Sequence, residues 1–506
     1  MNYRKTYTLF TAFLLILLLA ACTEKEGTEP TNDKIESASA KKEQQNSNQA
    51  VEQQQDKMKN NITLAVEKGF VGDEIEFTID ELQPNESAQL IWNRVEGEYI
   101  VEDSYRFIGL NFTEKDEIIV EGMVDAQGNW SSTFTVPEGF GGKSTIWVAQ
   151  GGKKIGQVGF SVETKFTMEP ESGPVGTEIT IKATGIGWST YQRNWMLTYD
   201  NKYTGFMSAI STNGTGEAKI RAAGPIGKKM ISLRTGFIGS GYLNYAQGPF
   251  GDRDVPDMIF EVTEGVAANI NNYVEPAPVA AHGGAKQASA VNKNGVEVTI
   301  NKNEAIVGEE VSITATGLPK DKDVQFIFNT MRGSRVSGTG YGKEIVDLGK
   351  GKSDSNGHIT YNFAVPDDLG GIPHLIDIQV EGESYGQTYL RILPSIVSFE
   401  PKSGPVGTKI KVTIKGGGWT EFDNAYYLTY DNAYIGYMCA FNSMGDLTFD
   451  VYATGETGHH IIDMYPGIYV QEDEGYDMTI LPQLSYVNDH PGSAMPAIRM
   501  SFLVTE

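Results

Sequence analysis

The chain contains one stretch of sequence twice, and this duplication constrains its fold more than any other feature. Residues 168–207 and 399–438 align without a gap at an offset of 231 residues (399 − 168). Each copy contains Pro-x-Ser-Gly-Pro-Val-Gly-Thr, beginning at Pro170 and at Pro401, and later Leu-Thr-Tyr-Asp-Asn. A repeat of this size predicts a repeated structural unit.

The segments that precede the two copies also match each other, more weakly. Asp125-Ala-Gln-Gly corresponds to Asp354-Ser-Asn-Gly, and a Phe-x-Val-Pro segment follows each of them. We therefore expect a duplicated pair of units, in the order A, B, A′, B′. The predicted parts are a signal peptide (1–21), a tether (22–61), unit A (62–164), unit B (165–264), a linker (265–295), unit A′ (296–394) and unit B′ (395–506).

Within the units, apolar residues alternate with polar ones. The segments 178–183 and 409–414 have this period of two, which is typical of half-buried strands. The 57 glycines recur at the spacing of turns between short strands. The pattern predicts an all-β protein of four tandem immunoglobulin-like β-sandwiches.

Two recurring turns follow from the residues. In the Gly-Pro-Val-Gly segments, Pro174 and Pro405 suit the second position of a tight turn, and the glycine two residues later suits the fourth. The Asp-Asn pairs at 200–201 and 431–432 suit hairpin turns, because both residue types tolerate positive φ. For these pairs we favour a turn over a ligand motif.

The two B units resemble IPT/TIG domains, immunoglobulin-like modules of plexins, transcription factors and bacterial surface proteins. The resemblance rests on the Pro-x-Ser-Gly-Pro-Val-Gly-Thr segment, the alternating strand after it, and the glycines before Trp188 and Trp419. That family often has Phe at the tryptophan position. The resemblance implies small sandwiches without catalysis, used for spacing, display or binding, but a fold does not define a function.

The N-terminal segment predicts export and lipidation. Arg4 and Lys5 precede the uncharged apolar run 9–21, which is short for a transmembrane helix. The run ends in Leu-Ala-Ala before Cys22 and resembles a bacterial lipobox, in which the cysteine becomes the first residue and carries a diacylglycerol. The resemblance implies a protein anchored by its acyl chains, palmitate among them, to the outer face of a cell membrane. An ordinary signal peptide is the alternative.

Composition narrows the environment and the partners. The tether is polar and too poor in apolar residues to bury a core. The formal net charge of −24 argues against a nucleic-acid partner. Cys439 is the only other cysteine, so no disulfide framework is expected, which suits a Gram-positive surface. Cys439 lies in a strand-like run, where we expect a small buried residue.

Histidines and acidic loops offer few catalytic or metal sites. The six histidines form no His-Glu-x-x-His motif, and neighbours such as His459 and His460 point to opposite faces of a strand. We expect that pair at a surface strand end. Asp252, Asp254 and Asp257 form an acidic cluster that is a weak candidate for Ca²⁺, with a solvated loop as the alternative. We expect no other cofactor.

The last loops of the B units are the candidate binding sites, because they differ in length and are rich in aromatic residues. The second loop is longer by 11 residues (242 − 231), as judged from the offset of the terminal strands. Such rings suit sugars or peptides, or else they pack against the sandwich. The candidate residues are Tyr242, Tyr245, Phe250, Tyr465, Tyr469, Tyr476 and Tyr486.

These features favour a lipid-anchored surface protein with a non-catalytic role in binding or display. Its expected partners are the membrane, through the anchor, and a surface protein or polysaccharide. One alternative is a carbohydrate-binding protein that acts on cell wall or external polysaccharide. The other is an enzyme whose site lies in the long loops, which a cluster of His490, Asp489 and a serine around a deep pocket would indicate.

Overall fold

The computed structural model describes residues 62–102, 106–237, 240–247, 257–278, 287–334, 340–371, 373–418, 425–468, 481–492 and 495–506. All of these belong to one compact unit of the chain, Asn60–Glu506. The signal peptide and the tether, with Cys22, lie outside the described residues.

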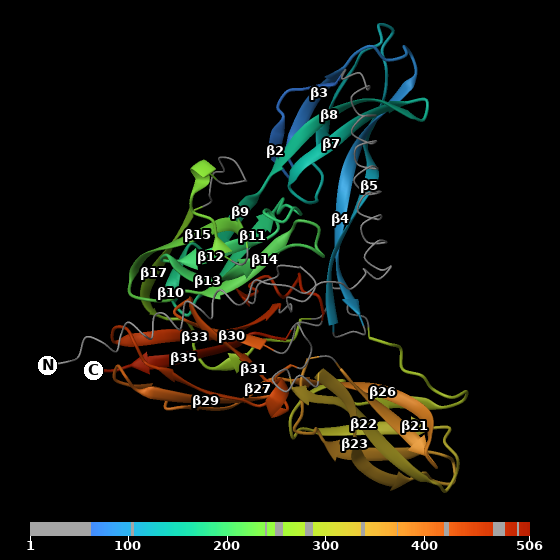
Figure 1. The fold of residues 1–506 in the computed structure, drawn as a ribbon, viewed down its shortest axis with the longest axis vertical. Helices are drawn as coiled ribbons and strands as arrows, with labels where there is room; N and C mark the ends of the chain where they lie inside the picture. The colour runs from blue at the N-terminus through green and yellow to red at the C-terminus, as the bar shows by residue number, and fades with distance from the viewer. Residues whose placement is uncertain are drawn as a thin grey trace, which may run out of the picture. The chain divides into compact units, whose positions relative to one another are not determined.

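The described elements are strands and two short 3-10 turns, so the predicted all-β class is confirmed (Figure 1). Unit A contains β1 (Ile62–Leu64), β2 (Lys68–Phe70), β3 (Glu74–Ile79), β4 (Ser87–Glu102), β5 (Arg106–Met123), β6 (Trp130–Thr135), β7 (Gly142–Gln150) and β8 (Lys153–Glu163). Unit B contains β9 (Lys165–Glu169), β10 (Ser172–Val175), β11 (Glu178–Thr184), β12 (Trp195–Tyr199), β13 (Lys202–Met207), β14 (Gly216–Arg221), β15 (Gly227–Phe237), β16 (Ser240–Gly241), η1 (Tyr245–Gln247) and β17 (Asp257–Val266).

The second half repeats this order after a short extra strand, β18 (Tyr273–Val274). Unit A′ contains β19 (Glu297–Ile300), β20 (Glu304–Ile306), β21 (Glu310–Thr316), β22 (Asp323–Ser334), β23 (Gly340–Lys352), β24 (Ile359–Ala364), β25 (His374–Val380) and β26 (Glu383–Leu393). Unit B′ contains β27 (Ser395–Glu400), β28 (Ser403–Gly404), β29 (Lys409–Lys415), β30 (Ala425–Tyr430), β31 (Ala433–Cys439), η2 (Phe441–Ser443), β32 (Leu447–Tyr452), β33 (Gly458–Ile468), β34 (Leu481–Pro482) and β35 (Ile498–Val504).

Each unit pairs a three-stranded sheet with a larger sheet, as in an immunoglobulin-like sandwich. The larger sheets follow the orders β2-β8-β7-β4-β5 in A and β20-β26-β25-β22-β23 in A′. In the B units the main orders are β10-β17-β15-β12-β13 and β18-β35-β33-β30-β31. The strands β13 and β31 therefore occupy equivalent edge positions in B and B′.

Both recurring turns form, and one differs from the prediction. The Asp-Asn pairs have positive φ in both copies, from 46° at Asp431 to 62° at Asn201, as expected for a tight hairpin. In the other turn, the Thr177 N–H donates to the Pro174 carbonyl at 3.0 Å, so the proline is the first residue and not the second. Gly176 is then the third residue, and its φ of 89° is the value that a type II turn requires there.

Glycines explain how each A unit joins the B unit that follows it. Gly141 pairs in a parallel bridge with Gly187, and Gly370 pairs in the same way with Gly418. A Cβ atom built on Gly141 would lie 1.8 Å from the backbone oxygen of Gly185, so the two backbones meet where a side chain cannot fit. The duplicated pair therefore keeps the same joint in both halves.

The segment 265–295 is more structured than the linker predicted there. β17 continues to Val266, and β18 pairs with β35 at the edge of the B′ sheet. Ile270 also packs against the core of B. Residues 265–278 are thus held by apolar and backbone contacts to both B units, whereas residues 291–293 form hydrogen bonds with Tyr385 and Gln387 of A′.

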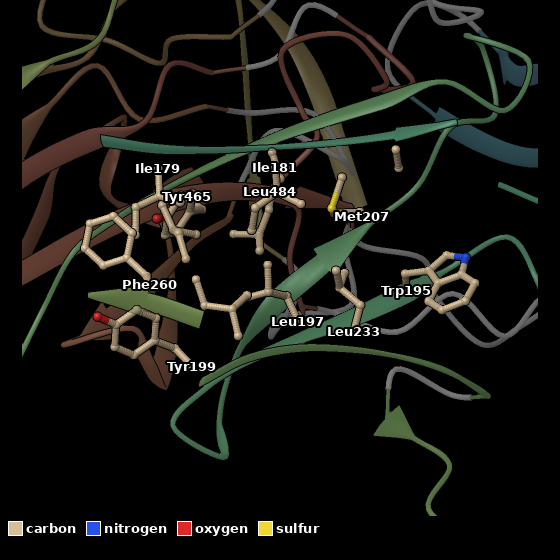
Figure 2. Packing of buried hydrophobic residues seen from close by; sticks show 14 of the residues in the cluster. Ile179, Ile181, Trp195, Leu197, Tyr199, Met207, Leu233, Phe260, Tyr465 and Leu484 are labelled. Carbon is tan, nitrogen blue, oxygen red and sulfur yellow. The ribbon is translucent and has the colours of Figure 1, made fainter. Parts of the chain in front are cut away.

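The hydrophobic core of unit B extends into unit B′, which also has a core of its own around Ile410 and Val412. The cluster that contains Ile179 and Ile181 of B also contains Tyr465 and Leu484 of B′ (Figure 2). All four side chains are 0 or 1% exposed. Burial of apolar surface across this seam stabilises both units together, at about 25 cal/mol per Å².

Charged residues lie in the same buried seam. Asp463 of β33 accepts hydrogen bonds from Arg221 of β14, and its second oxygen lies 3.1 Å from the Arg499 guanidinium. Arg499 also donates from Nε to Glu275 at 2.7 Å, and its guanidinium lies 4.7 Å from the ring centre of Tyr465. Two buried cations therefore face two carboxylates, which offsets the cost of burying each charge.

We predict that Asp463→Ala lowers the free energy of unfolding by about 3–5 kcal/mol, because two buried arginines lose a shared partner. Urea unfolding measures this change. The matched control is Asp450→Ala, which breaks an exposed pair with Lys409 and should cost about 0–1 kcal/mol. Equal effects of the two substitutions would contradict the account.

Candidate functional site: the long loop of unit B′

The described part of the long B′ loop runs from its own sheet onto unit B. β34 pairs with the end of β33, and the Gln483 N–H donates to the Pro466 carbonyl at 3.0 Å. One residue later, the Leu484 N–H donates to the carbonyl of Phe206 in β13 at 2.8 Å. Gln483 and Phe206 form a parallel bridge, so the loop extends the edge of the B sheet.

Asp489, further along this loop, joins three units through one carboxylate. Its Oδ2 accepts hydrogen bonds from the Tyr99 hydroxyl of A at 3.0 Å and the Ser208 hydroxyl of B at 2.6 Å. Its Oδ1 accepts from the Ser211 N–H and hydroxyl, both at 2.8 Å. Asp489 is 0% exposed, and these four donors satisfy it in place of water.

Tyr99 reaches Asp489 because β4 and β5 form a long hairpin, of 16 and 18 residues. The ring of Tyr99 belongs to an apolar cluster with Phe107 of the hairpin and with Met196, Phe206 and Ile210 of B. Burial raises the pKa of the Tyr99 hydroxyl, and the negative charge of Asp489 adds to the rise. The hydroxyl therefore stays protonated and acts as a hydrogen-bond donor.

Two of the candidate contact residues are buried in the seam. Tyr465 is 0% exposed and Tyr486 is 2% exposed, and the Tyr486 hydroxyl donates to Glu275. Burial raises the pKa of both hydroxyls. Neither ring is available to a ligand, which corrects the expectation of a contact surface at these two positions. Both rings pack against the sandwich, which was the alternative to a contact role.

The other candidates are described in part or not at all. Tyr242 is half-buried beside β16, and its N–H donates to the Thr235 carbonyl at 3.0 Å. Tyr245 lies in η1, where only its backbone is described. Phe250, Tyr469 and Tyr476 lie outside the described residues, and their contact role stays a prediction.

The acidic cluster is described only at Asp257, at the start of β17. Its Oδ1 accepts hydrogen bonds from the Ser232 hydroxyl at 2.6 Å and from Arg234 at 3.2 Å. The Asp257 carboxylate therefore has hydrogen-bond donors from the protein itself. Asp252 and Asp254 lie outside the described residues. Within the described ranges, no group of three or more His, Cys, Asp or Glu side chains could hold a metal ion.

The enzyme alternative required a cluster of His490, Asp489 and a serine, and this loop contains part of that arrangement. Asp489 does contact Ser208 and Ser211, but Asp489 and Ser208 are 0% and 2% exposed, so a substrate does not reach them in this structure. Burial lowers the pKa of His490 to about 3, so this imidazole is neutral near pH 7. A group with that pKa is a weak general base at neutral pH.

His460 is buried, where we expected a surface strand end. Its Nδ1 lies 2.6 Å from an Asp431 carboxylate oxygen, and its Nε2 lies 2.8 Å from the Glu456 carbonyl. Both ring nitrogens face acceptors, and this arrangement favours the protonated ring, which carries a hydrogen on each nitrogen. Burial opposes this charge, but the hydrogen bond and negative charge of Asp431 raise the pKa of His460. Lys229 lies 3.5 Å from Asp200 at the equivalent place in B.

Cys439 is exposed, where we expected a small buried residue. Its counterpart at the offset of 231, Ser208, is 2% exposed because the B′ loop covers it. The difference arises from the surroundings of the strand and not from the strand itself. An alignment of the two copies therefore does not reveal it.

Sequence reasoning missed Arg221, Asp463 and Arg499. A signal was present, since each is a charged residue between two apolar neighbours: Ile220-Arg221-Ala222, Ile462-Asp463-Met464 and Ile498-Arg499-Met500. Opposite charges in buried strands favour pairing, since an isolated buried charge is costly. Which strands would face each other could not be read from that pattern.

No family model matches the chain, and no curated protein matches it. Solved structures with distant likeness include alpha-2-macroglobulin of Salmonella, with 9% identity over 88% of this chain and 31% of that chain and a TM-score of 0.19. Alpha-2-macroglobulin of E. coli has 9% identity over 87% of this chain and 31% of that chain, with a TM-score of 0.17. Spo0M of Bacillus subtilis has 8% identity over 38% of this chain and 89% of that chain, with a TM-score of 0.15. The chain spans about a third of the length of the macroglobulins, and TM-scores this low carry no argument about function.

A helix suited to span a membrane does not occur in the described ranges.

We predict that Asp489→Ala lowers the free energy of unfolding by about 3 kcal/mol or more, because buried donors in A and B lose their acceptor. Thermal or urea unfolding tests this. Val487→Ala is the matched control two residues away, since Val487 is 36% exposed and should change stability by less than about 0.5 kcal/mol. A loss at Asp489 no larger than the control's would contradict the three-unit contact.

The raised pKa of His460 predicts stability that falls as pH rises above the pKa of an unfolded histidine. Its contribution is complete below the pKa of an unfolded histidine, about 6.5, and is lost as pH rises through the raised pKa of the folded state. Urea midpoints measured across this range test the loss. His460→Lys, which copies Lys229 of unit B, should remove this part of the pH dependence because lysine keeps its charge; an unchanged profile would contradict the assignment.

Proposed function

We propose that the protein is exported, anchored by lipid at Cys22, and binds a partner outside the cell through its immunoglobulin-like units. The observation that carries the proposal is the sequence Leu-Ala-Ala-Cys at 19–22, directly after an apolar run with Arg4 and Lys5 before it. Two acyl chains are enough for stable anchoring, whereas one is marginal. The scarcity of cysteine supports a Gram-positive surface.

The binding role draws on the B units. Their IPT/TIG resemblance supports recognition or display, and the loop aromatics that remain candidates are Tyr242, Tyr245, Phe250, Tyr469 and Tyr476. A surface protein or a polysaccharide is the proposed partner. Polysaccharide binding is the second candidate, favoured by the density of tyrosine in these loops, because aromatic faces stack on sugar rings.

We propose no catalytic role and no resident cofactor. The buried state of Asp489, together with the neutral His490, supports a structural use of the residues that an enzyme would need. Calcium at Asp252 and Asp254 stays a prediction that the described residues do not address. Nucleic acid is not a proposed partner, because the net charge of −24 opposes it.

The anchor is tested by expression in a Gram-positive host with a clickable palmitate analogue. We expect the native chain to be labelled and to sediment with membranes, and the Cys22→Ser chain to be unlabelled. Cys439→Ser is the matched control, since it removes the only other cysteine and should leave labelling unchanged. Label that persists in Cys22→Ser, or an unlabelled native chain in the cytosol, would contradict the proposal.

A further inference from the structure

The edge strand of B is covered in a way that the edge strand of B′ is not. β13 and β31 correspond at the offset of 231, and both pair with the preceding strand through an Asp-Asn turn and a register shift at the same place. On β13, Thr204 and Phe206 are 0% and 3% exposed. On β31, the equivalent Ile435 and Tyr437 are 52% and 54% exposed.

Three elements produce the cover on β13. Thr204 donates a hydrogen bond to the Asn432 carbonyl in the β30–β31 turn of B′ at 2.7 Å. The hairpin β4–β5 of A packs Tyr99 and Phe107 against Phe206, and the segment Leu481–Ser485 runs beside the strand. The approach is close, because a Cβ atom built on Gly205 would lie 2.5 Å from the Pro482 carbonyl oxygen. A Cβ atom on Gly436, the counterpart in β31, meets nothing within 4 Å.

The described strands of the A′ hairpin are shorter than those of the A hairpin. β22 and β23 have 12 and 13 residues, compared with 16 and 18 in β4 and β5. The cluster at that joint contains Met331, Leu369 and Phe441 and does not extend to Tyr437.

The edge at β31 has a bulge at Ile435, where its pairing with β30 shifts register, but it lacks the charged residues and prolines that protect many edge strands from pairing. Its seven residues, Ala-Tyr-Ile-Gly-Tyr-Met-Cys, include no charge and no proline. Tyr437 stacks on Tyr427 at 6.2 Å, and Tyr427 contacts Tyr434, which meets Tyr203 of B at 6.4 Å. The exposed ring of Tyr437 is thus linked to the seam between B and B′ through the buried ring of Tyr427.

We propose that β31 is a docking edge for an extended, apolar segment of a partner protein, which pairs with it as Leu481–Ser485 pairs with β13. Main-chain hydrogen bonds, such as that from Leu484 to Phe206, would supply the pairing, and Tyr437 with Ile435 would contact an apolar side chain of the partner. The inference deepens the proposed binding role, on which it rests, by naming the kind of partner. It does not depend on the lipid anchor.

The test uses the exported chain with Cys22→Ser and a labelled peptide with the sequence of residues 481–489, Leu-Pro-Gln-Leu-Ser-Tyr-Val-Asn-Asp. Fluorescence anisotropy should show saturable binding that Tyr437→Lys weakens at least about tenfold, because a charge on an edge strand opposes pairing. Ile435→Lys provides a second variant in case one misfolds. Tyr452→Lys is the matched control, since Tyr452 is 53% exposed on another strand, and it should leave the affinity unchanged.

Three results would overturn the inference. The first is an absence of binding while all variants keep the native urea midpoint. The second is peptide binding that Tyr437→Lys and Ile435→Lys leave unchanged, which would place the peptide on β13 by exchange with the chain's own segment. The third is self-association that Tyr437→Lys abolishes, which would make the occupant a second copy of this chain. Loss of lipid labelling in cells would leave the peptide result unaffected, so the two proposals fail separately.

Discussion

Asp463, shared between Arg221 and Arg499 inside the seam, fixes how the two halves of this chain meet. An apolar seam alone would tolerate sliding, because hydrophobic contacts have no direction. A buried carboxylate that faces two guanidinium groups tolerates no such shift, since a displacement would leave charge unpaired in the interior. Glu275 completes the charge balance from the segment between the halves, so that segment is part of the same structure.

The long B′ loop uses the same seam to secure unit A. It leaves its own sheet at β34, adds to the edge of B at Phe206, and presents Asp489 to donors from A and B. The contacts with Phe206 and Tyr99 join parts of the chain that are separated by hundreds of residues. The duplication therefore produced two similar sandwiches whose surroundings differ, and this difference leaves β31 open while β13 is covered.

Much of the fold could be predicted from local sequence, because it depends on local chemistry. Alternation over residues 178–183 predicts a strand, and the Asp-Asn pairs predict turns with positive φ. The position of Pro174 in its turn was wrong by one residue, since composition does not distinguish the first turn position from the second. The glycines before Trp188 were used as a family signature, and their physical role, close approach to Gly141, emerged only from the structure.

The site could not be predicted in the same way. Tyr465 and Tyr486 have the composition of a binding loop, but their environment is set by strands from the other half of the chain. Cys439 and Ser208 are aligned residues with opposite exposure, for the same reason. Nothing in the alternation of a strand encodes which surface of another unit will cover it.

The central claim is that B and B′ form one cooperative structure across a charged, buried seam. Native-state hydrogen exchange as a function of urea tests it most directly, with amides of β12 and β30 compared in the same experiment. The account predicts that both strands open with the same free energy and the same urea dependence. Opening of β12 at a free energy well below that of β30, or the reverse, would show that the two units unfold separately and would contradict the claim.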